Sequence, residues 1–240
     1  MQKYLNSELY KLPFTNKGAK FGSGKSGITW DPAIDTDTTP EEINFWFSIG
    51  STYTYLTVNR LHEVVKKENI KFNWHPFSVR KIMMDMDNIP FTPPAKKIKS
   101  DYMWRDIERR AKFYGFEARV PAPYPLKEFD LANQIAILGM NEGWGVEYVY
   151  KTYQRWFQQG REPATQPNLN EIFQELNLDP DTTIKKANEQ EIKDKYLSNT
   201  EYAYKKGVFG SPTFVYDGKE VFWGDDRLEE CIKWIRLKGK

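Results

Sequence analysis

The chain has 240 residues, of which 40% are hydrophobic and 15% are aromatic, so a full hydrophobic core can form and global disorder is excluded. Its 35 basic and 33 acidic residues give a net charge of +2, which provides no electrostatic basis for nucleic acid or an anionic membrane as a partner. No apolar run approaches the roughly 20 residues that cross a bilayer, and the N-terminus lacks the apolar core of a signal peptide. We therefore expect a cytoplasmic location.

The supply of cysteine and histidine narrows the chemistry further. Cys231 is the one cysteine of the chain, which excludes an intrachain disulfide and a CxxC redox pair. His62 and His75 are the two histidines, and their thirteen-residue separation does not match the spacing of metal ligands. We expect no metal site.

Residues 1–42 are rich in Lys, Gly, Thr, Asp and Asn and show little periodicity, which predicts a loop-rich N-terminal extension. Within it, the stretch from Ala19 to Ser26 has a superficial likeness to a phosphate-binding loop. However, Ala19 stands where that motif needs its first glycine, and no apolar strand precedes it. We interpret the stretch as a flexible turn.

The first regular elements follow as strand, helix and strand. β-branched and aromatic residues predict a central strand over residues 43–47. Apolar residues then recur at helical spacing and predict a helix over 53–67, with Ser51 or Thr52 as its cap. A second strand is predicted over 71–75. This order is typical of a right-handed βαβ unit.

The middle of the chain is predicted to be helical and the C-terminal part to return to strand. From about residue 96 to residue 204, glycines and prolines interrupt helical patterns, which indicates four or five helices. Strands are predicted over 213–216 and 220–223, because an Asp-Gly pair between two apolar runs is a strong hairpin signal. A final amphipathic helix begins at Asp225 and presents one apolar face, formed by Leu228, Cys231, Ile232 and Ile235.

Ser51 stands where the first strand ends and its helix begins. The free N–H groups of a first helical turn and the helix dipole favour an anion at such a place, including a thiolate brought by a ligand. The simpler interpretation is an ordinary N-cap. From this segment alone the N-cap is favoured, because serine is a common capping residue.

Two further motifs lie near the C-terminus. A trans bond is the general expectation for Pro212 at the start of a strand. The sequence of residues 209–214, Phe-Gly-Ser-Pro-Thr-Phe, is instead typical of the thioredoxin-fold loop in which this proline is cis and the preceding residue, Ser211, faces the active helix. Asp225 and Asp226 open the last helix, where they either act as simple caps or hold an ammonium group.

Four segments of the chain resemble the 2-hydroxychromene-2-carboxylate isomerases and the kappa-class glutathione transferases. Residues 45–56, FWFSIGSTYTYL, are similar to their opening strand, turn and helix, and residues 99–115, beginning KSDYMWRDIERRA, to their first insertion helix. Residues 207–214, GVFGSPTF, and 222–228, FWGDDRL, are similar to their C-terminal motif. The order and spacing of the segments make the resemblance specific, and it covers the chain except for residues 1–42.

The resemblance implies an α/β thioredoxin fold with a large, DsbA-like all-helical insertion. Residues 43–78 and 206–240 would form the thioredoxin-like domain, residues 79–205 the insertion and residues 1–42 an extension.

Glutathione is the ligand that the resemblance implies. Ser51 matches the family's active-site serine, whose hydroxyl donates a hydrogen bond to the glutathione thiolate. Ser211, before the cis Pro212, matches the residue that pairs with the cysteinyl backbone, and Asp225 and Asp226 match the pair that holds the γ-glutamyl end. The remaining expected contacts are Thr52, Tyr53, Asn88 and Lys99 for glutathione and Tyr124 for the substrate.

The expected function is that of a glutathione-dependent isomerase or transferase acting on an aromatic or conjugated small molecule. The sequence does not determine the oligomeric state, and a homodimer is one possible assembly. Ser48 and Thr52 stand where the family usually has Asp and Pro, and the Pro93–Pro94 region replaces an Asn that binds the isomerase substrate. These departures leave the electrophile open. Disulfide exchange by a resident cysteine pair is excluded because Ser51 cannot form a disulfide. A DsbA-family protein with a non-catalytic binding role is the alternative.

Overall fold

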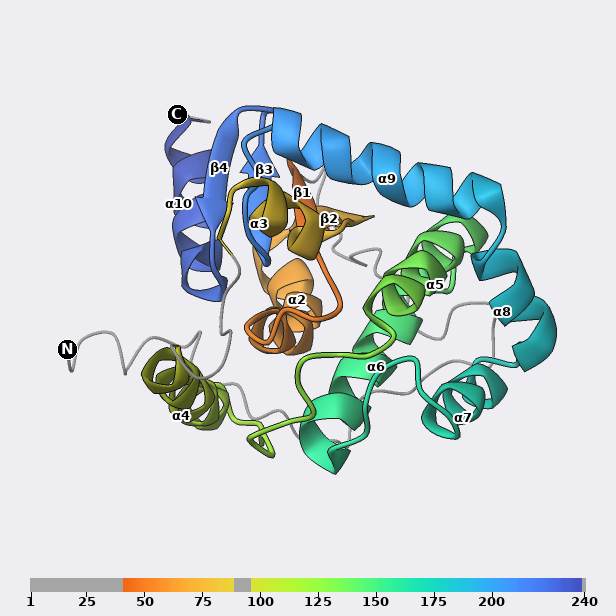
Figure 1. The fold of residues 1–240 in the computed structure, drawn as a ribbon. Coiled ribbons are helices and arrows are strands. Elements are labelled where there is room, and N and C mark those ends of the chain that lie inside the picture. The colour runs from red at the N-terminus through yellow and green to blue at the C-terminus, as the bar shows by residue number, and fades with distance from the viewer. Residues whose placement is uncertain (1–40, 89–95, 239–240) are drawn as a thin grey trace.

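A four-stranded mixed sheet forms the centre of the molecule (Figure 1). The computed structural model describes residues 41–88 and 96–238, so the predicted extension, with its turn at residues 19–26, lies almost wholly outside the described residues. The strands follow the order β2-β1-β3-β4, with β1 and β2 parallel and the other two pairs antiparallel. Their bounds are β1 (Glu41–Phe47), β2 (Ile70–Pro76), β3 (Thr213–Tyr216) and β4 (Glu220–Trp223).

The C-terminal end of the central strand β1 is buried on both faces, which explains its three consecutive aromatic residues, Phe45, Trp46 and Phe47. On one face, Phe45 stacks on Phe214 of β3 with ring centroids 5.5 Å apart, and Trp74 of β2 meets Phe45 edge-on at 4.8 Å. On the other face, Trp46 is 2% exposed and stacks on His75 at 4.5 Å. Aromatic pairs of this kind stabilise cross-strand pairing beyond the burial of their area.

Helix α2 (Thr54–Glu68) connects β1 to β2 and completes the predicted βαβ unit. It packs against β2 and against α4 (Lys97–Phe113) and α6 (Gly145–Gln159), so its N-terminal end lies where the sheet meets the helices. The expected cap was wrong: the N-cap position is occupied by Tyr53, without a side-chain cap hydrogen bond. The hydroxyl groups of Ser51 and Thr52 bond elsewhere, to Ser211 and Met103.

Seven helices separate β2 from β3 in the described part of the chain. Six of them fall between residues 97 and 205, where four or five were predicted. The difference arises from α7 and α8, which have eight residues each and are too short for a clear helical period. Figure 1 shows α9 running from the sheet across α5 toward α8. Beyond α4 and α6, the bounds are α3 (Val79–Asp85), α5 (Phe129–Glu142), α7 (Asn168–Glu175), α8 (Pro180–Ala187) and α9 (Gln190–Lys205).

The C-terminal hairpin and helix agree with the sequence pattern. Asp217 and Gly218 turn between β3 and β4 with φ angles of 52° and 68°, the left-handed pair that a two-residue hairpin turn requires. The last helix begins with a 3-10 turn, η2 (Asp225–Arg227), and continues as α10 (Leu228–Lys238). Burial raises the pKa of the Cys231 thiol to about 12, so this cysteine is a small core residue at neutral pH.

The thioredoxin fold expected from the resemblance is confirmed by this topology, with helices inserted between β2 and β3. None of the helices within residues 41–88 and 96–238 has the length and apolar character that crossing a membrane requires.

Candidate functional site

A tight turn, Ser48–Ser51, carries Ser51 from the end of β1 to the start of α2. The turn closes through a hydrogen bond from the Ser51 N–H to the Ser48 carbonyl, 3.0 Å long. Gly50 has a φ of 128°, and a Cβ at this position would lie 2.5 Å from Cδ2 of Phe129. The position therefore requires glycine both for its backbone conformation and for the close approach of the Phe129 ring.

Ser211 faces this turn, as predicted, and the Ser211–Pro212 peptide bond is cis. The Ser51 hydroxyl donates to the Ser211 carbonyl at 2.5 Å. In the other direction, the Ser48 N–H donates to the Ser211 hydroxyl at 2.9 Å, and the Thr54 hydroxyl lies 2.9 Å from the same oxygen. Side chain and backbone of Ser211 thus tie the loop before β3 to the first residues of α2.

The start of α2 offers unused hydrogen-bond donors. Within the described part of the chain, the N–H groups of Thr52, Tyr53 and Thr54 donate no hydrogen bond. Half-exposed Ser51 stands immediately before them. Free N–H groups and the positive end of the helix dipole attract an anion, so the local electrostatics favour a bound carboxylate or thiolate here.

Two buried side chains from the inserted helices hold the turn from behind. Asn133 of α5 accepts a hydrogen bond from the Ile49 N–H at 2.7 Å and donates to the Ile49 carbonyl at 2.9 Å. The Tyr153 hydroxyl of α6 lies within donating distance of the Ser48 and Ser51 carbonyls, at 3.0 and 3.1 Å. Burial raises the pKa of Tyr153, so its hydroxyl stays protonated as a donor.

Sequence reasoning missed both residues. Tyr153 is one aromatic residue among several on its helix, and its pattern is that of a packing residue. Asn133 did leave a signal, because an amide within the apolar sequence of α5 needs a buried partner. The pattern does not say which partner that is.

Helix α4 covers the other side of the turn through the two residues that follow Ser51. The Thr52 hydroxyl lies 3.0 Å from the Met103 sulfur, and the Tyr53 hydroxyl donates to Asp106 at 3.1 Å. Burial and the Asp106 charge raise the pKa of the Tyr53 phenol. Both predicted glutathione contacts therefore direct their side chains to α4, which leaves their N–H groups as the polar atoms at the site.

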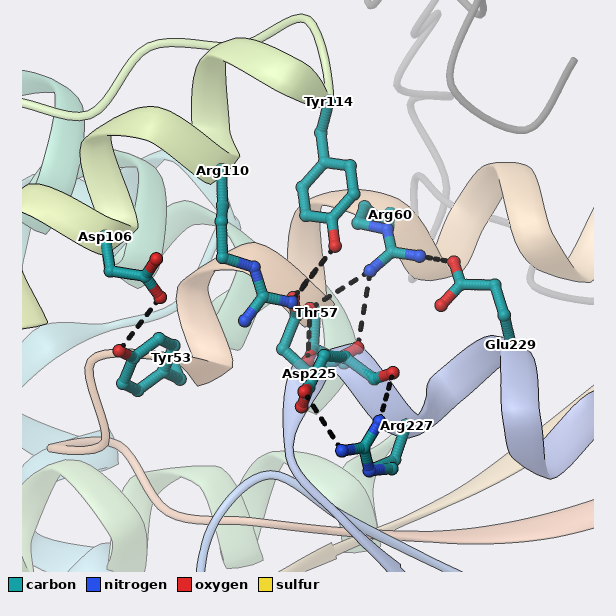
Figure 2. Close-up of polar contacts among 10 residues, drawn as sticks. Tyr53, Thr57, Arg60, Asp106, Arg110, Tyr114, Asp225, Arg227 and Glu229 are labelled. Atoms are coloured by element: carbon teal, nitrogen blue, oxygen red, sulfur yellow. Dashed lines mark hydrogen bonds and ion pairs between the residues drawn. The ribbon is translucent and has the colours of Figure 1, made fainter. Parts of the chain in front are cut away.

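Asp225 lies at the centre of a cluster that joins three segments (Figure 2). Its carboxylate accepts hydrogen bonds from Thr57 at 3.1 Å, Arg60 at 3.2 Å and Tyr114 at 3.2 Å, and forms a closer ion pair with Arg110. The residue is 1% exposed. Because a carboxylate has about four acceptor positions, this set of donors occupies the whole group, and the predicted use of the Asp225 side chain by a ligand does not match its contacts.

Asp226, in contrast, directs an exposed carboxylate to the surface beside the same cluster. Its side chain is 54% exposed and its nearest cation, Arg227, lies 3.5 Å away. Of the predicted acidic pair, Asp226 is the member with acceptor capacity left for a ligand.

Three other predicted site residues lie on the insertion. Asn88, just after α3, and Lys99, in the first turn of α4, are exposed and flank residues 89–95, so their part in binding stays a prediction. Tyr124, in the loop before α5, packs edge-on against Trp104 with centroids 6.0 Å apart. Burial raises the pKa of Tyr124, while the charge of Arg80 acts in the opposite direction.

A cavity of about 620 Å³ lies elsewhere, between β2, α5 and α9. It is lined by Trp46, His75, Met140, Lys195 and Tyr202, among others, and not by Ser51, Ser211 or Asp226. Desolvation by burial, reinforced by Lys195, lowers the pKa of His75 to about 4, so this histidine is neutral at physiological pH. The residues described contain no group of His, Cys, Asp and Glu arranged to hold a metal ion.

Comparison with known proteins places the chain among related sequences. The family model for the DSBA-like thioredoxin domain matches residues 42–235. A 2-hydroxychromene-2-carboxylate isomerase from Pseudomonas putida is 23% identical over 186 residues, which cover 78% of this chain and 90% of the relative. Glutathione S-transferase kappa 2 from Caenorhabditis elegans is 25% identical over 207 residues, covering 80% and 91% of the two chains.

Solved structures show the same fold. A structure of 2-hydroxychromene-2-carboxylate isomerase aligns with a TM-score of 0.72 at 22% identity, covering 82% of this chain and 95% of the other. The cytosolic disulfide reductase DsbM from Pseudomonas aeruginosa, in a structure with GSH, aligns with a TM-score of 0.55 at 13% identity, covering 82% and 98%.

Proposed function

The chain belongs to the family of DsbA-like thioredoxin domains, and we propose that it binds glutathione and acts as an isomerase or transferase on an aromatic or conjugated small molecule. One observation carries the proposal: the Ser51 hydroxyl lies 2.5 Å from the carbonyl of Ser211, directly before the free N–H groups of α2. The names of the isomerase and kappa-class relatives support the same class of reaction.

The polar groups at this place fit the functional groups of glutathione. A hydroxyl and helix N–H groups suit a thiolate, a backbone carbonyl suits a peptide N–H once its present donor turns away, and an exposed carboxylate suits an ammonium group. These are offered by Ser51, the Ser211 carbonyl and Asp226. Asn88 and Lys99 would add contacts from the insertion, and the backbone of Thr52 and Tyr53 would complete the anion site.

Bound glutathione would supply a thiolate nucleophile for an electrophilic carbon of the substrate. Ser51 would stabilise it after turning its O–H away from the Ser211 carbonyl, which then accepts from the peptide instead. The N-terminus of α2 would lower the thiol pKa through its N–H groups and dipole. Asn133 and Tyr153 would keep the turn in place during this exchange, and Tyr124 would face the substrate.

Some structural relatives are oxidoreductases, but their disulfide chemistry does not suit this chain. Ser51 stands at the helix start, and the one cysteine, Cys231, is buried in the core. Disulfide exchange through a resident cysteine pair is therefore excluded. A non-catalytic binding role is the remaining alternative.

Glutathione binding is tested by thermal unfolding of the whole chain with and without the ligand. A ligand at a hundred times its Kd stabilises the folded state by about 2.7 kcal/mol. We expect reduced glutathione to raise the Tm of the wild-type protein and the S51A variant to respond less. An unchanged Tm at millimolar glutathione, supported by calorimetry without binding heat, would contradict the proposal and favour a role without glutathione.

A further inference from the structure

The cavity of about 620 Å³ lies between three elements that are labelled in Figure 1, β2, α5 and α9, and we call it the α9 groove. Six of its lining residues come from α9 and recur at helical spacing, so they form one stripe of that helix. They are Lys195, Ser198, Asn199, Glu201, Tyr202 and Lys205. Because an α-helix rises about 1.5 Å per residue, the two lysines are attached about 15 Å apart, at opposite ends of the stripe.

Aromatic side chains form the floor of the α9 groove. Trp46 of β1 stacks on His75 of β2, and its ring centroid lies 5.9 Å from that of Tyr202. The Tyr202 ring is 51% exposed although it borders the buried Trp46. The groove therefore offers apolar ring surface to an occupant.

The charges around this floor are mainly positive. Lys195 and Lys205 form no ion pair with another residue of the described chain. Lys206 adds a third positive charge, with its Nζ 5.4 Å from the centre of the Tyr202 ring. Glu201 is the one carboxylate among the described residues that line the groove. The matching occupant is a segment that carries apolar side chains and several carboxylates.

The chain has such a segment directly before β1. Residues 29–38 read TWDPAIDTDT and hold three aspartates and no Lys or Arg; the aspartates are Asp31, Asp35 and Asp37. Trp30 and Ile34 each stand next to one of these carboxylates. An extended chain advances about 3.3 Å per residue, so aspartates four positions apart are separated by about 13 Å, close to the spacing of the two groove lysines.

The segment is long enough to reach the groove. Strand β1 begins at Glu41, and Trp46 lies five positions further, about 17 Å along the strand. The six positions between Asp35 and Glu41 span up to about 20 Å. Alternate residues of a strand share a face, so Glu42 and Asn44 mark the route to Trp46. They are exposed and half-exposed, respectively, which leaves this route open.

We infer that the α9 groove is an intramolecular docking site for the acidic segment of residues 29–38. The aspartates pair with Lys195 and Lys205, and the apolar side chains of Trp30 and Ile34 cover the aromatic floor. The short connection to β1 gives the segment a high effective concentration at the groove, so ion pairs that are individually weak suffice to hold it. The contact is independent of the proposed function, because neither Ser51 nor Ser211 lines the groove.

Zero-length cross-linking of the full chain tests the contact without any substitution. A carbodiimide activates a carboxylate, a neighbouring lysine amine attacks it to form an amide bond, and the carbodiimide leaves as a urea that carries one carboxylate oxygen. By mass spectrometry, we expect Lys195 or Lys205 to be linked to aspartates of the segment. Lys185 and Lys193, which are exposed outside the groove, are internal controls and should form no such link.

Mixing ¹⁵N-labelled with unlabelled protein before the reaction separates two occupants of the groove. A link within one chain joins peptides of the same isotopic composition, which is the expected result. Links between a labelled and an unlabelled chain would assign the groove to a second copy and overturn the intramolecular contact. The contact would also be overturned if neither Lys195 nor Lys205 formed a link to the segment.

Proteolysis of charge variants provides an independent measurement. A protease that cleaves before aspartate reports the accessibility of the segment through the initial rate of cleavage before Asp37. We expect this rate to rise about fivefold or more in K195E/K205E, because the loss of two ion pairs increases the undocked population. K185E/K193E has the same change in net charge and should keep the wild-type rate.

A milder variant keeps this measurement decisive. K195Q/K205Q removes the two charges without reversing them, so its rate should lie between those of the wild type and K195E/K205E. It replaces K195E/K205E if that variant fails to show the wild-type circular dichroism spectrum and Tm. Wild-type rates in both groove variants, or an equal rise in K185E/K193E, would overturn the docking of the segment by the groove lysines.

Discussion

The side-chain amide of Asn133 pairs with the backbone of Ile49 as a neighbouring strand would, accepting from its N–H at 2.7 Å and donating to its carbonyl at 2.9 Å. Both residues are fully buried. Ile49 lies just beyond the end of β1, where the sheet provides no further ladder partner. One amide of α5 therefore satisfies two backbone groups and fixes the turn that carries Ser51.

The first prediction removes this amide. N133A would leave the N–H and the carbonyl of Ile49 buried without partners, so we expect the free energy of unfolding to fall by about 2–4 kcal/mol. Urea unfolding measures this loss. N141A, at an exposed asparagine of the same helix, is the control and should change stability by less than about 0.5 kcal/mol. Equal, small effects of both variants would show that Asn133 does not hold the turn.

The second prediction concerns Tyr153, whose hydroxyl donates to the carbonyls of the Ser51 turn. Y153F keeps the buried ring and removes only this donor, so we expect a loss of roughly 0.5–1.5 kcal/mol of stability. Because the turn is loosened, glutathione affinity should fall as well. Y150F on the same helix removes a hydroxyl that bonds to Gln154 and should leave glutathione affinity unchanged. Calorimetric titration with glutathione measures the affinities of the two variants, and equal affinities would contradict the role of Tyr153.

The third prediction separates the two adjacent aspartates. D225N would leave Arg60 and Arg110 around a neutral amide, so we expect a destabilisation of about 3–5 kcal/mol, as for other broken buried ion pairs. D226N should leave stability unchanged and weaken glutathione binding, since a charge-assisted hydrogen bond contributes roughly 1.5–3 kcal/mol. Urea unfolding and calorimetry distinguish the roles. Normal glutathione affinity in D226N would mean that Asp226 does not contact the ligand.

The fourth prediction is a pH dependence due to His75. Its pKa is lowered to about 4 in the folded protein, chiefly by desolvation, whereas an unperturbed histidine has a pKa of about 6.5. The folded state binds the imidazole proton less tightly than the unfolded state does. The stability associated with neutral, buried His75 is therefore fully present above about pH 6.5 and is lost as the pH falls toward 4. We expect the wild type to lose roughly 1–3 kcal/mol more than H75Q over this interval. Urea unfolding at pH 7.5 and at acidic pH provides the comparison, and parallel curves for the two proteins would contradict it.

Features that depend on residues close together in the chain could be predicted from the sequence more readily than contacts between distant residues. The hairpin at Asp217–Gly218 and the apolar strand β1 depend on neighbouring residues, so composition and spacing were sufficient. The pairing of Ser51 with Ser211 spans 160 positions, and its prediction depended on the resemblance to a known family.

Long-range contacts of residues to which the family resemblance assigned no role were not predicted. The partners of Asn133, Tyr153, Arg60 and Arg110 lie 84 to 165 positions away along the chain, and each of these residues has an ordinary local pattern. Asp225 shows the consequence. Its position at the start of a helix predicts a cap or a ligand contact, but its burial by two arginines depends on the packing of α2, α4 and η2.

The last prediction concerns Ser51, the residue on which the proposed chemistry depends. S51A removes the hydroxyl and keeps the N–H groups of α2, so stabilisation of a bound thiolate should be lost only in part. One charge-assisted hydrogen bond of roughly 1.5–3 kcal/mol corresponds to about one to two pKa units, and we expect the pKa of bound glutathione to rise by that amount. The ultraviolet absorbance of the thiolate, followed against pH with glutathione bound, measures the shift.

S51C provides an independent test, because a thiol at this helix start should have a lowered pKa and attack oxidised glutathione, forming a mixed disulfide and releasing one glutathione thiolate. Mass spectrometry detects the adduct, and C231S in the S51C background shows that the adduct is not on the buried core cysteine. If S51A leaves the titration unmoved and S51C forms no adduct, the Ser51 hydroxyl only connects the turn to Ser211, and the glutathione mechanism has to be abandoned even though the fold stands.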